Sequence, residues 1–319
     1  MSLGEILKEG FRITHHNWPL VLVQGAGLFL LFSVLFFTIF VPLLISGSAS
    51  SLDDFQWEDL LYSDPEELIS EWLLFFLFLI GPFLLLGITL SLVFYIFVSG
   101  GVRGIYKEEL LFKKLPSPQT VSDFPNPGLR FSFSRFFKHG KNYFWRIAGL
   151  WALLGFLSLP LLIMGIVLFG GIAYLFEMEE WGEGIMALVL LGILLVPASL
   201  LFTLFSYFSN TFLVMEDKGP GISLRGGFQF LKSHFGPSLG IFLLLYLLIF
   251  FASSLFIGIQ LPFSFIPLLG TFLSLFLLPF QIFLSIYLTL FMTATLMVFY
   301  QDRTKTERID FRKTFDSGQ

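Results

Sequence analysis

Residues 236–300 read "GPSLGIFLLLYLLIFFASSLFIGIQLPFSFIPLLGTFLSLFLLPFQIFLSIYLTLFMTATLMVFY" and contain no Asp, Glu, Lys, Arg or His. About 20 consecutive apolar residues cross a bilayer as one helix, so this stretch is long enough to cross twice. Gln260-Leu261-Pro262 and Ile266-Pro267 lie near its middle. Because proline interrupts a helix, the stretch predicts two spans joined by a short hairpin, with a re-entrant turn as the alternative.

The composition of the whole chain agrees with a membrane protein. Of the 319 residues, 55% are hydrophobic and only 13% are charged, and the mean hydropathy is +0.83. A soluble domain carries roughly a quarter charged residues, so this chain lacks the polar groups to cover a globular surface. The 44 phenylalanines are typical of lipid-facing and inter-helix packing. The absence of cysteine excludes disulfides, thiolate metal sites and cysteine nucleophiles.

Apolar runs predict an all-α, polytopic bundle that forms a single membrane domain over residues 1–319. Six spans can be drawn, at about 19–46, 72–99, 146–176, 184–209, 238–258 and 266–300. All 19 Lys and Arg then fall on one side of the membrane, in the N-terminus, the loop 101–145 with Arg146 directly after it, the 210–237 connection and the tail 301–319. The opposite connections, 52–71 and 177–183, carry acids and no Lys or Arg. The positive-inside rule therefore places both termini in the cytoplasm.

A short basic and aromatic segment precedes each odd-numbered span, which suggests a threefold repeat. Aligning Asn17, Asn142 and His234 also aligns Phe11, Phe136 and Phe228, and then Trp18, Tyr143 and Phe235. The repeat units cover about 1–100, 129–210 and 220–300. Each would contribute one helical hairpin, so the six spans form three hairpins.

These segments are predicted to be interfacial helices at the cytoplasmic face. Aromatic side chains enter the acyl boundary there while Lys and Arg meet anionic head groups. The residues expected to meet lipid head groups are Lys8, Arg12, Trp18, Arg135, Lys138, Lys141, Tyr143, Trp145, Arg225 and Lys232. Membrane lipids are therefore the expected partner of the basic loops, and nucleic acid is not.

Residues 210–246, "NTFLVMEDKGPGISLRGGFQFLKSHFGPSLGIFLLLY", place an acid and a glycine before a Ser-Leu pair, a basic-aromatic helix and the next span. This order of residues resembles that of a broad group of bacterial six-span membrane proteins. The group includes the membrane region fused to some glycerophosphodiester phosphodiesterases. The stretch 135–146, "RFFKHGKNYFWR", is similar in kind. The resemblance implies the cytoplasmic (inner) membrane of a bacterium. The phosphodiesterase barrel has no counterpart here, so that activity is not implied.

The sequence shows little that could support catalysis. The drawn spans hold no ionisable residue away from their ends, which argues against a proton-coupled transporter, a pump or an intramembrane acid-base enzyme. Adjacent helical residues point about 100° apart, so His15 and His16 would not readily chelate one metal ion. Gln24 and Gln281 are the side chains that could line an intramembrane polar path. No cofactor is predicted.

Two functions follow from these observations. The first is a non-enzymatic scaffold, assembly or accessory subunit of a membrane complex, a role that includes organising lipid, with a membrane protein partner or a homo-oligomer. The alternative is a transporter or translocase of a lipid or other apolar solute, for which a polar groove at Gln24 and Gln281 would be the structural sign.

Overall fold

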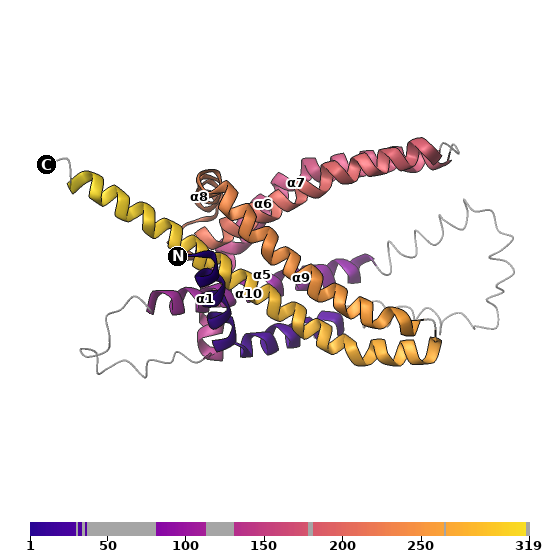
Figure 1. Cartoon of the computed structure of the whole chain (residues 1–319), viewed down its shortest axis with the longest axis horizontal. Coiled ribbons are helices and arrows are strands. Elements are labelled where there is room, and N and C mark those ends of the chain that lie inside the picture. Colours follow the sequence, from indigo (N-terminus) through magenta and orange to yellow (C-terminus); the bar gives the residue numbers. More distant parts are fainter. Residues whose placement is uncertain are drawn as a thin grey trace, which may run out of the picture. The chain divides into compact units, whose positions relative to one another are not determined.

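The computed structural model describes residues 1–29, 31–33, 36, 81–112, 131–177, 181–264 and 266–316. The elements within these ranges are α-helices (Figure 1). They are α1 (Leu3–His16), α5 (Gly81–Phe112), α6 (Phe133–Glu177), α7 (Trp181–Glu216), α8 (Pro220–Ser233), α9 (Phe235–Ser264) and α10 (Pro267–Asp316). The acidic connection 52–71 and the proline-rich part of the 101–145 loop lie outside the described residues.

Five of the helices are long and apolar enough to cross a membrane. These candidate spans are Leu84–Leu111, Phe133–Ile172, Gly184–Glu216, Phe235–Phe263 and Thr271–Lys305. They correspond to the second to sixth spans drawn from the sequence, and they make the chain a multi-pass helical membrane protein. Of the predicted first span, the structure describes a shorter apolar helix, Pro19–Ser33; much of 34–46 lies outside the described residues.

The chain divides into two compact units, Met1–Leu20 with Ser99–Gln319, and Val21–Val98. In the smaller unit, the described residues of Val21–Val98 include the first part of α5. There Gly27 lies so close to the Phe94 ring that a side chain at position 27 would collide with it. The Phe94 ring therefore occupies the space that a side chain at position 27 would take.

The core of the larger unit is formed where α8 meets α7 and α10, on the side of the long helices that is predicted to face the cytoplasm. Phe208, Phe230, Phe299 and Tyr300 are buried there. The Phe208 and Phe230 ring centroids are 4.9 Å apart, and those of Phe230 and Tyr300 are 4.8 Å apart. These aromatic contacts join the three helices, since buried aromatic rings contribute both area and specific geometry.

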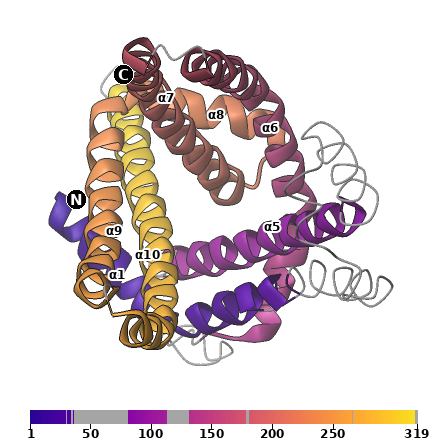
Figure 2. The same cartoon turned by 90° about the vertical axis from the view of Figure 1, so that its right-hand side faces the viewer.

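The other halves of the long helices are mostly exposed within the structure. On α6 and α7, Phe156 is 73% exposed, Val167 66% and Ile193 65%. Helices that are apolar on all sides and uncovered by protein are suited to a lipid environment. α9 and α10 lie side by side, separated only at residues 265–266, as Figure 2 shows. The break predicted near Ile266-Pro267 is therefore present, and it lies between two long helices.

Two helix boundaries differ from the sequence prediction. The second span was expected to end at 99, but α5 continues to Phe112, because the residues "GVRGIYKEELLF" include no proline. The segment before the third span was expected to be a separate interfacial helix, yet α6 runs without interruption from Phe133. The other two segments do form separate helices, and each is followed by a proline, Pro19 or Pro237. Proline cannot donate the next helical hydrogen bond, and residues 143–159 hold none.

Candidate membrane-interface site

The short helices α1 and α8 are both set by local signals in the sequence. Ser2 caps α1, accepting from the Glu5 backbone at 3.3 Å while the Glu5 carboxylate accepts from the Ser2 N–H at 2.7 Å. This capping box defines the start of the helix. α8 starts with Pro220 in its first turn, after Gly219, where the missing N–H costs nothing. Asn17 and His234 occupy the C-cap positions of α1 and α8.

α1 and α8 bury equivalent residues. The buried positions are Ile6, Glu9, Gly10, Ile13 and Thr14 in α1, and Ser223, Gly226, Gly227, Phe230 and Leu231 in α8. Taken in order, each buried residue of α1 is the same number of positions before its counterpart in α8. Asn17 and His234 are separated by that same number of positions. The two helices therefore pack through the same face in the same register.

The long helices that receive these faces are also in register. A Cβ on Gly10 would lie 2.9 Å from the Thr295 Cα of α10, and a Cβ on Gly227 would lie 2.7 Å from the Ser209 Cα of α7. Both glycines therefore allow close helix packing.

An aromatic pair follows each of these glycine contacts. Phe11 packs edge-on against Phe291 at 6.4 Å, and Phe228 packs edge-on against Phe205 at 6.3 Å. The separation between Phe205 and Phe291 along the chain equals the separation between Ser209 and Thr295. The α1–α10 and α8–α7 pairs are thus two copies of one arrangement.

The exposed faces of the two helices match as well. Lys8 corresponds to Arg225 and His15 to Lys232, and all four are exposed. Phe11 corresponds to Phe228, and these side chains are 52% and 58% exposed; Trp18 corresponds to Phe235, at 53% and 46%. Each helix therefore presents two basic or histidine side chains next to two aromatic ones.

The segment at the start of α6 is arranged differently. Its buried residues Phe136, Gly140 and Tyr143 match the spacing of Gly10, Thr14 and Asn17 in α1. By burial, then, Tyr143 rather than Asn142 corresponds to Asn17. The glycines at this contact lie on α5 instead: a Cβ on Gly101 would meet the Phe136 ring, and one on Gly104 would meet His139.

Three consecutive charged residues near the end of α5 join the surrounding helices. We call Lys107, Glu108 and Glu109 the α5 triplet. Adjacent residues on a helix point about 100° apart, so each member reaches a different neighbour.

Glu109 reaches α1. Its carboxylate accepts from the Asn17 side-chain amide, lies 3.2 Å from the His16 Nδ1 and pairs with Arg12 at 3.3 Å. Arg12 also pairs with Glu9 at 2.8 Å. The pKa of the Arg12 guanidinium is raised, chiefly because it donates to Glu9, although its partial burial works the other way. Arg12 is therefore engaged inside the structure.

Glu108 and Lys107 reach α6 and the turn after α7. Glu108 lies 2.9 Å from the His139 Nε2 and 3.7 Å from an Arg135 nitrogen. Lys107 pairs with Asp217 and donates to the Val214 carbonyl at 2.7 Å. The hydroxyl of Tyr143 donates to Asp217 at 2.8 Å. The triplet therefore connects α1, α6 and the α7–α8 turn.

Asp217 is the point where this network meets the α7–α8 turn. Its φ of 53° lies in the left-handed region, which aspartate tolerates better than most residues. Burial disfavours its charged form, but hydrogen bonds from Lys107 and Tyr143 and the nearby charges of Lys107 and Arg146 outweigh this. Together they lower the pKa of the Asp217 carboxyl below its ordinary value. Asp217 is therefore a stabilised anion in the turn.

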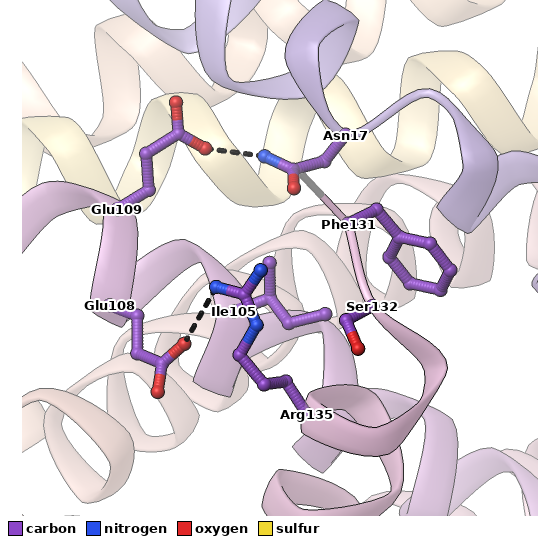
Figure 3. A pocket seen from close by; sticks show the side chains of 7 residues that line it. All are labelled: Asn17, Ile105, Glu108, Glu109, Phe131, Ser132 and Arg135. Atoms are coloured by element: carbon purple, nitrogen blue, oxygen red, sulfur yellow. Dashed lines mark hydrogen bonds and ion pairs between the residues drawn. The ribbon is translucent and has the colours of Figure 1, made fainter. Parts of the chain in front are cut away.

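A small cavity lies between the α5 triplet and the start of α6 (Figure 3). Its lining residues are Asn17, Ile105, Glu108, Glu109, Phe131, Ser132 and Arg135. Figure 3 shows the Asn17 amide directed at Glu109 on one side and Arg135 directed at Glu108 on the other. The cavity volume is about 10 Å³, which is room for about one water molecule. A lipid or metabolite would not fit in it.

The residues predicted to contact head groups fall into two sets. Those with exposed side chains are Lys8, Trp18, Lys138, Lys141, Trp145, Arg225 and Lys232. Arg12, although also exposed, contacts Glu109, while Arg135 and the buried Tyr143 contact Glu108 and Asp217. Gln24 belongs to the smaller unit and Gln281 to the larger one, so a polar path that joins them stays a prediction.

The sequence analysis missed the acidic members of this network. Glu108 and Glu109 were assigned to a loop because the apolar run ends near Ser99, although the following residues favour a helix. Three successive charges on a continuing helix could have indicated contacts to several neighbours. Nothing in the sequence singles out Asp217 among the other loop acids.

No group of three or more His, Cys, Asp or Glu side chains in the described part of the chain is placed to hold a metal ion. No protein-family model, curated protein or solved structure matches this chain. The six-span resemblance therefore stays a prediction from the quoted stretches.

Proposed function

We propose that this chain is a non-enzymatic membrane protein that serves as a scaffold, assembly factor or accessory subunit of a membrane complex. In this proposal it crosses the cytoplasmic membrane of a bacterium six times as three hairpins, with both termini in the cytoplasm. The positions of all 19 Lys and Arg on one side of the drawn spans support this orientation.

The α5 triplet is the observation that carries the proposal. Lys107, Glu108 and Glu109 are engaged in contacts that join α1, α6 and the α7–α8 turn. Because these three charged side chains hold helices together, they support a structural role. Beyond them, the bodies of α6 and α7 expose apolar side chains such as Phe156, Ile166 and Ile193, which other membrane helices or lipids can cover.

Photo-crosslinking in cells tests the scaffold role. A photoreactive phenylalanine analogue would replace Phe169 of α6, which is 63% exposed, or the buried Phe242 of α9 as the matched control. The proposal expects a discrete, stoichiometric protein adduct from position 169 and none from position 242. Gentle-detergent purification then identifies the partner by mass spectrometry. A lone protein that carries one enriched lipid would instead favour the transporter alternative.

Cysteine labelling tests the orientation, because the natural chain has no cysteine. The proposal places Lys218 in the cytoplasm and Glu58 outside. An impermeant thiol reagent should label Glu58→Cys in intact cells, and Lys218→Cys only after the membrane is permeabilised. The reverse pattern would refute the orientation without bearing on the scaffold role.

A further inference from the structure

We propose that α1 and α8 are two matched anchors for anionic phospholipids, and that each binds a lipid phosphate through its exposed basic side chains. The anchor residues are Lys8 and His15 on α1, and Arg225 and Lys232 on α8. The inference deepens the proposed function, since it rests on the membrane placement of the chain but not on a protein partner.

The basic side chains of each anchor form a line along the helix. At about 100° per residue, positions seven apart point within about 20° of each other. Lys8 and His15 therefore make one line, as do Arg225 and Lys232, and the Phe11 or Phe228 side chain lies about 60° from it around the helix. The aromatic line of each anchor consists of that phenylalanine and of one ring after the C-cap, Trp18 or Phe235.

The position of each anchor in the chain favours a bilayer surface as the occupant. Phe235 is the first residue of a candidate span, Phe235–Phe263, and Trp18 precedes the apolar helix Pro19–Ser33. An aromatic line that leads into apolar helix is suited to the boundary between head groups and acyl chains. Basic side chains beside that line are then at the level of the lipid phosphates, where anionic lipids attract them.

The acids near the α1 anchor are already engaged. An open groove runs along α1, lined by Met1, Glu5, Lys8, Glu9, Phe11, Arg12, His15 and His16. Glu9 pairs with Arg12, and Glu5 accepts from the Ser2 backbone in the capping box. α8 contains no Asp or Glu. Counting histidine as neutral at pH 7, the anchor residues of α1 carry one positive charge, which the exposed Glu5 carboxylate in the same groove opposes, and those of α8 carry two, so α8 is the stronger anchor.

Native mass spectrometry of the detergent-purified full chain tests the proposal, by titration with phosphatidylglycerol or with phosphatidylcholine. A basic residue near an anionic surface contributes about a fivefold factor in affinity. Arg225→Ala with Lys232→Ala should lower phosphatidylglycerol affinity about 25-fold, and Lys8→Ala about fivefold. The matched control is Lys218→Ala with Lys305→Ala, which removes two exposed charges outside the anchors and should leave affinity within about twofold. Phosphatidylcholine binding should not change in any variant.

Equal loss in the control variant would overturn the proposal, because it would show only a response to net charge. Unchanged phosphatidylglycerol affinity in the Arg225 and Lys232 variant would also overturn it. The apparent melting temperature of each variant shows that the fold is kept, since all the substituted side chains are exposed. Failure of the scaffold role, seen as absent protein crosslinks, would leave this lipid titration unaffected, so the two proposals fail separately.

Discussion

Replacing Glu109 with alanine should detach α1 from the end of α5. The Glu109 side chain is only 9% exposed and accepts from Asn17, while Arg12 and His16 lie within 3.3 Å of its carboxylate. A hydrogen bond to a buried charged group is worth about 1.5–3 kcal/mol. Arg12 keeps Glu9 as a partner and is itself 47% exposed, so its contribution is small. We expect Glu109→Ala to cost about 2–3 kcal/mol.

Glu108 provides the matched control, one residue away on the same helix. Its side chain is 32% exposed and lies 3.7 Å from an Arg135 nitrogen and 2.9 Å from the His139 Nε2. Partly exposed ion pairs contribute about 0–1 kcal/mol, so Glu108→Ala should cost at most about 1 kcal/mol. The two variants have the same change in net charge and in helix propensity, and they differ in the burial of the carboxylate and in which neighbour they release.

Apparent melting temperature in one detergent, at one scan rate, measures the global effect, because membrane protein unfolding is often irreversible. At about 2–4 °C per kcal/mol, Glu109→Ala should lower it by about 4–12 °C and Glu108→Ala by less than about 4 °C. Hydrogen exchange gives the local effect: the amides of α1 should exchange faster in the first variant only. Equal or larger effects from Glu108→Ala, or unchanged exchange in α1, would refute the reasoning.

Three further changes test other parts of the larger unit by the same melting assay. Asp217→Asn should cost about 0.5–1 kcal/mol at neutral pH. Because the pKa of the Asp217 carboxyl is lowered in the fold, its contribution to stability is fully present above the ordinary pKa of 3.8 and is lost as the pH falls through the lowered pKa. A penalty that persists at the lowest pH would contradict this. Gly10→Ala should cost about 1–3 kcal/mol because the Thr295 backbone lies against it, whereas Gly4→Ala, with nothing within 4 Å, should be neutral or slightly stabilising. Phe230→Ala should cost about 3 kcal/mol and the exposed Phe228→Ala less than about 1 kcal/mol; similar losses would mean that Phe230 is not part of a packed core.

The long helices could be read from the sequence because lipid imposes a simple rule. In hydrocarbon every backbone N–H and C=O must be paired within the chain, so an uncharged run must be helical. The break between α9 and α10 could also be predicted, because Pro262 and Pro267 flank it and proline has no backbone N–H to donate to a helical hydrogen bond. These features depend on local composition alone.

The network around the α5 triplet could not be predicted from the sequence in the same way. Which acid pairs with which base depends on how helices far apart in sequence pack, and a single sequence carries no such distances. Glu109 and Asn17 lie 92 residues apart. Periodicity identified the basic and aromatic segments, but it did not show that Arg12 and Arg135 point toward acids of α5 rather than toward lipid.

Proline decides which of the three similar segments forms a short helix of its own. Where Pro19 or Pro237 follows, the helix stops, and the next apolar helix starts after a turn at Asn17 or His234. The short helix then packs one face against neighbouring helices and exposes the opposite face. Where no proline follows, α6 continues, and Tyr143 becomes part of a long helix that packs against α5 and reaches Asp217. A similar basic and aromatic pattern therefore gives two short helices and the first turns of one long helix, a difference that the basic and aromatic pattern alone does not show.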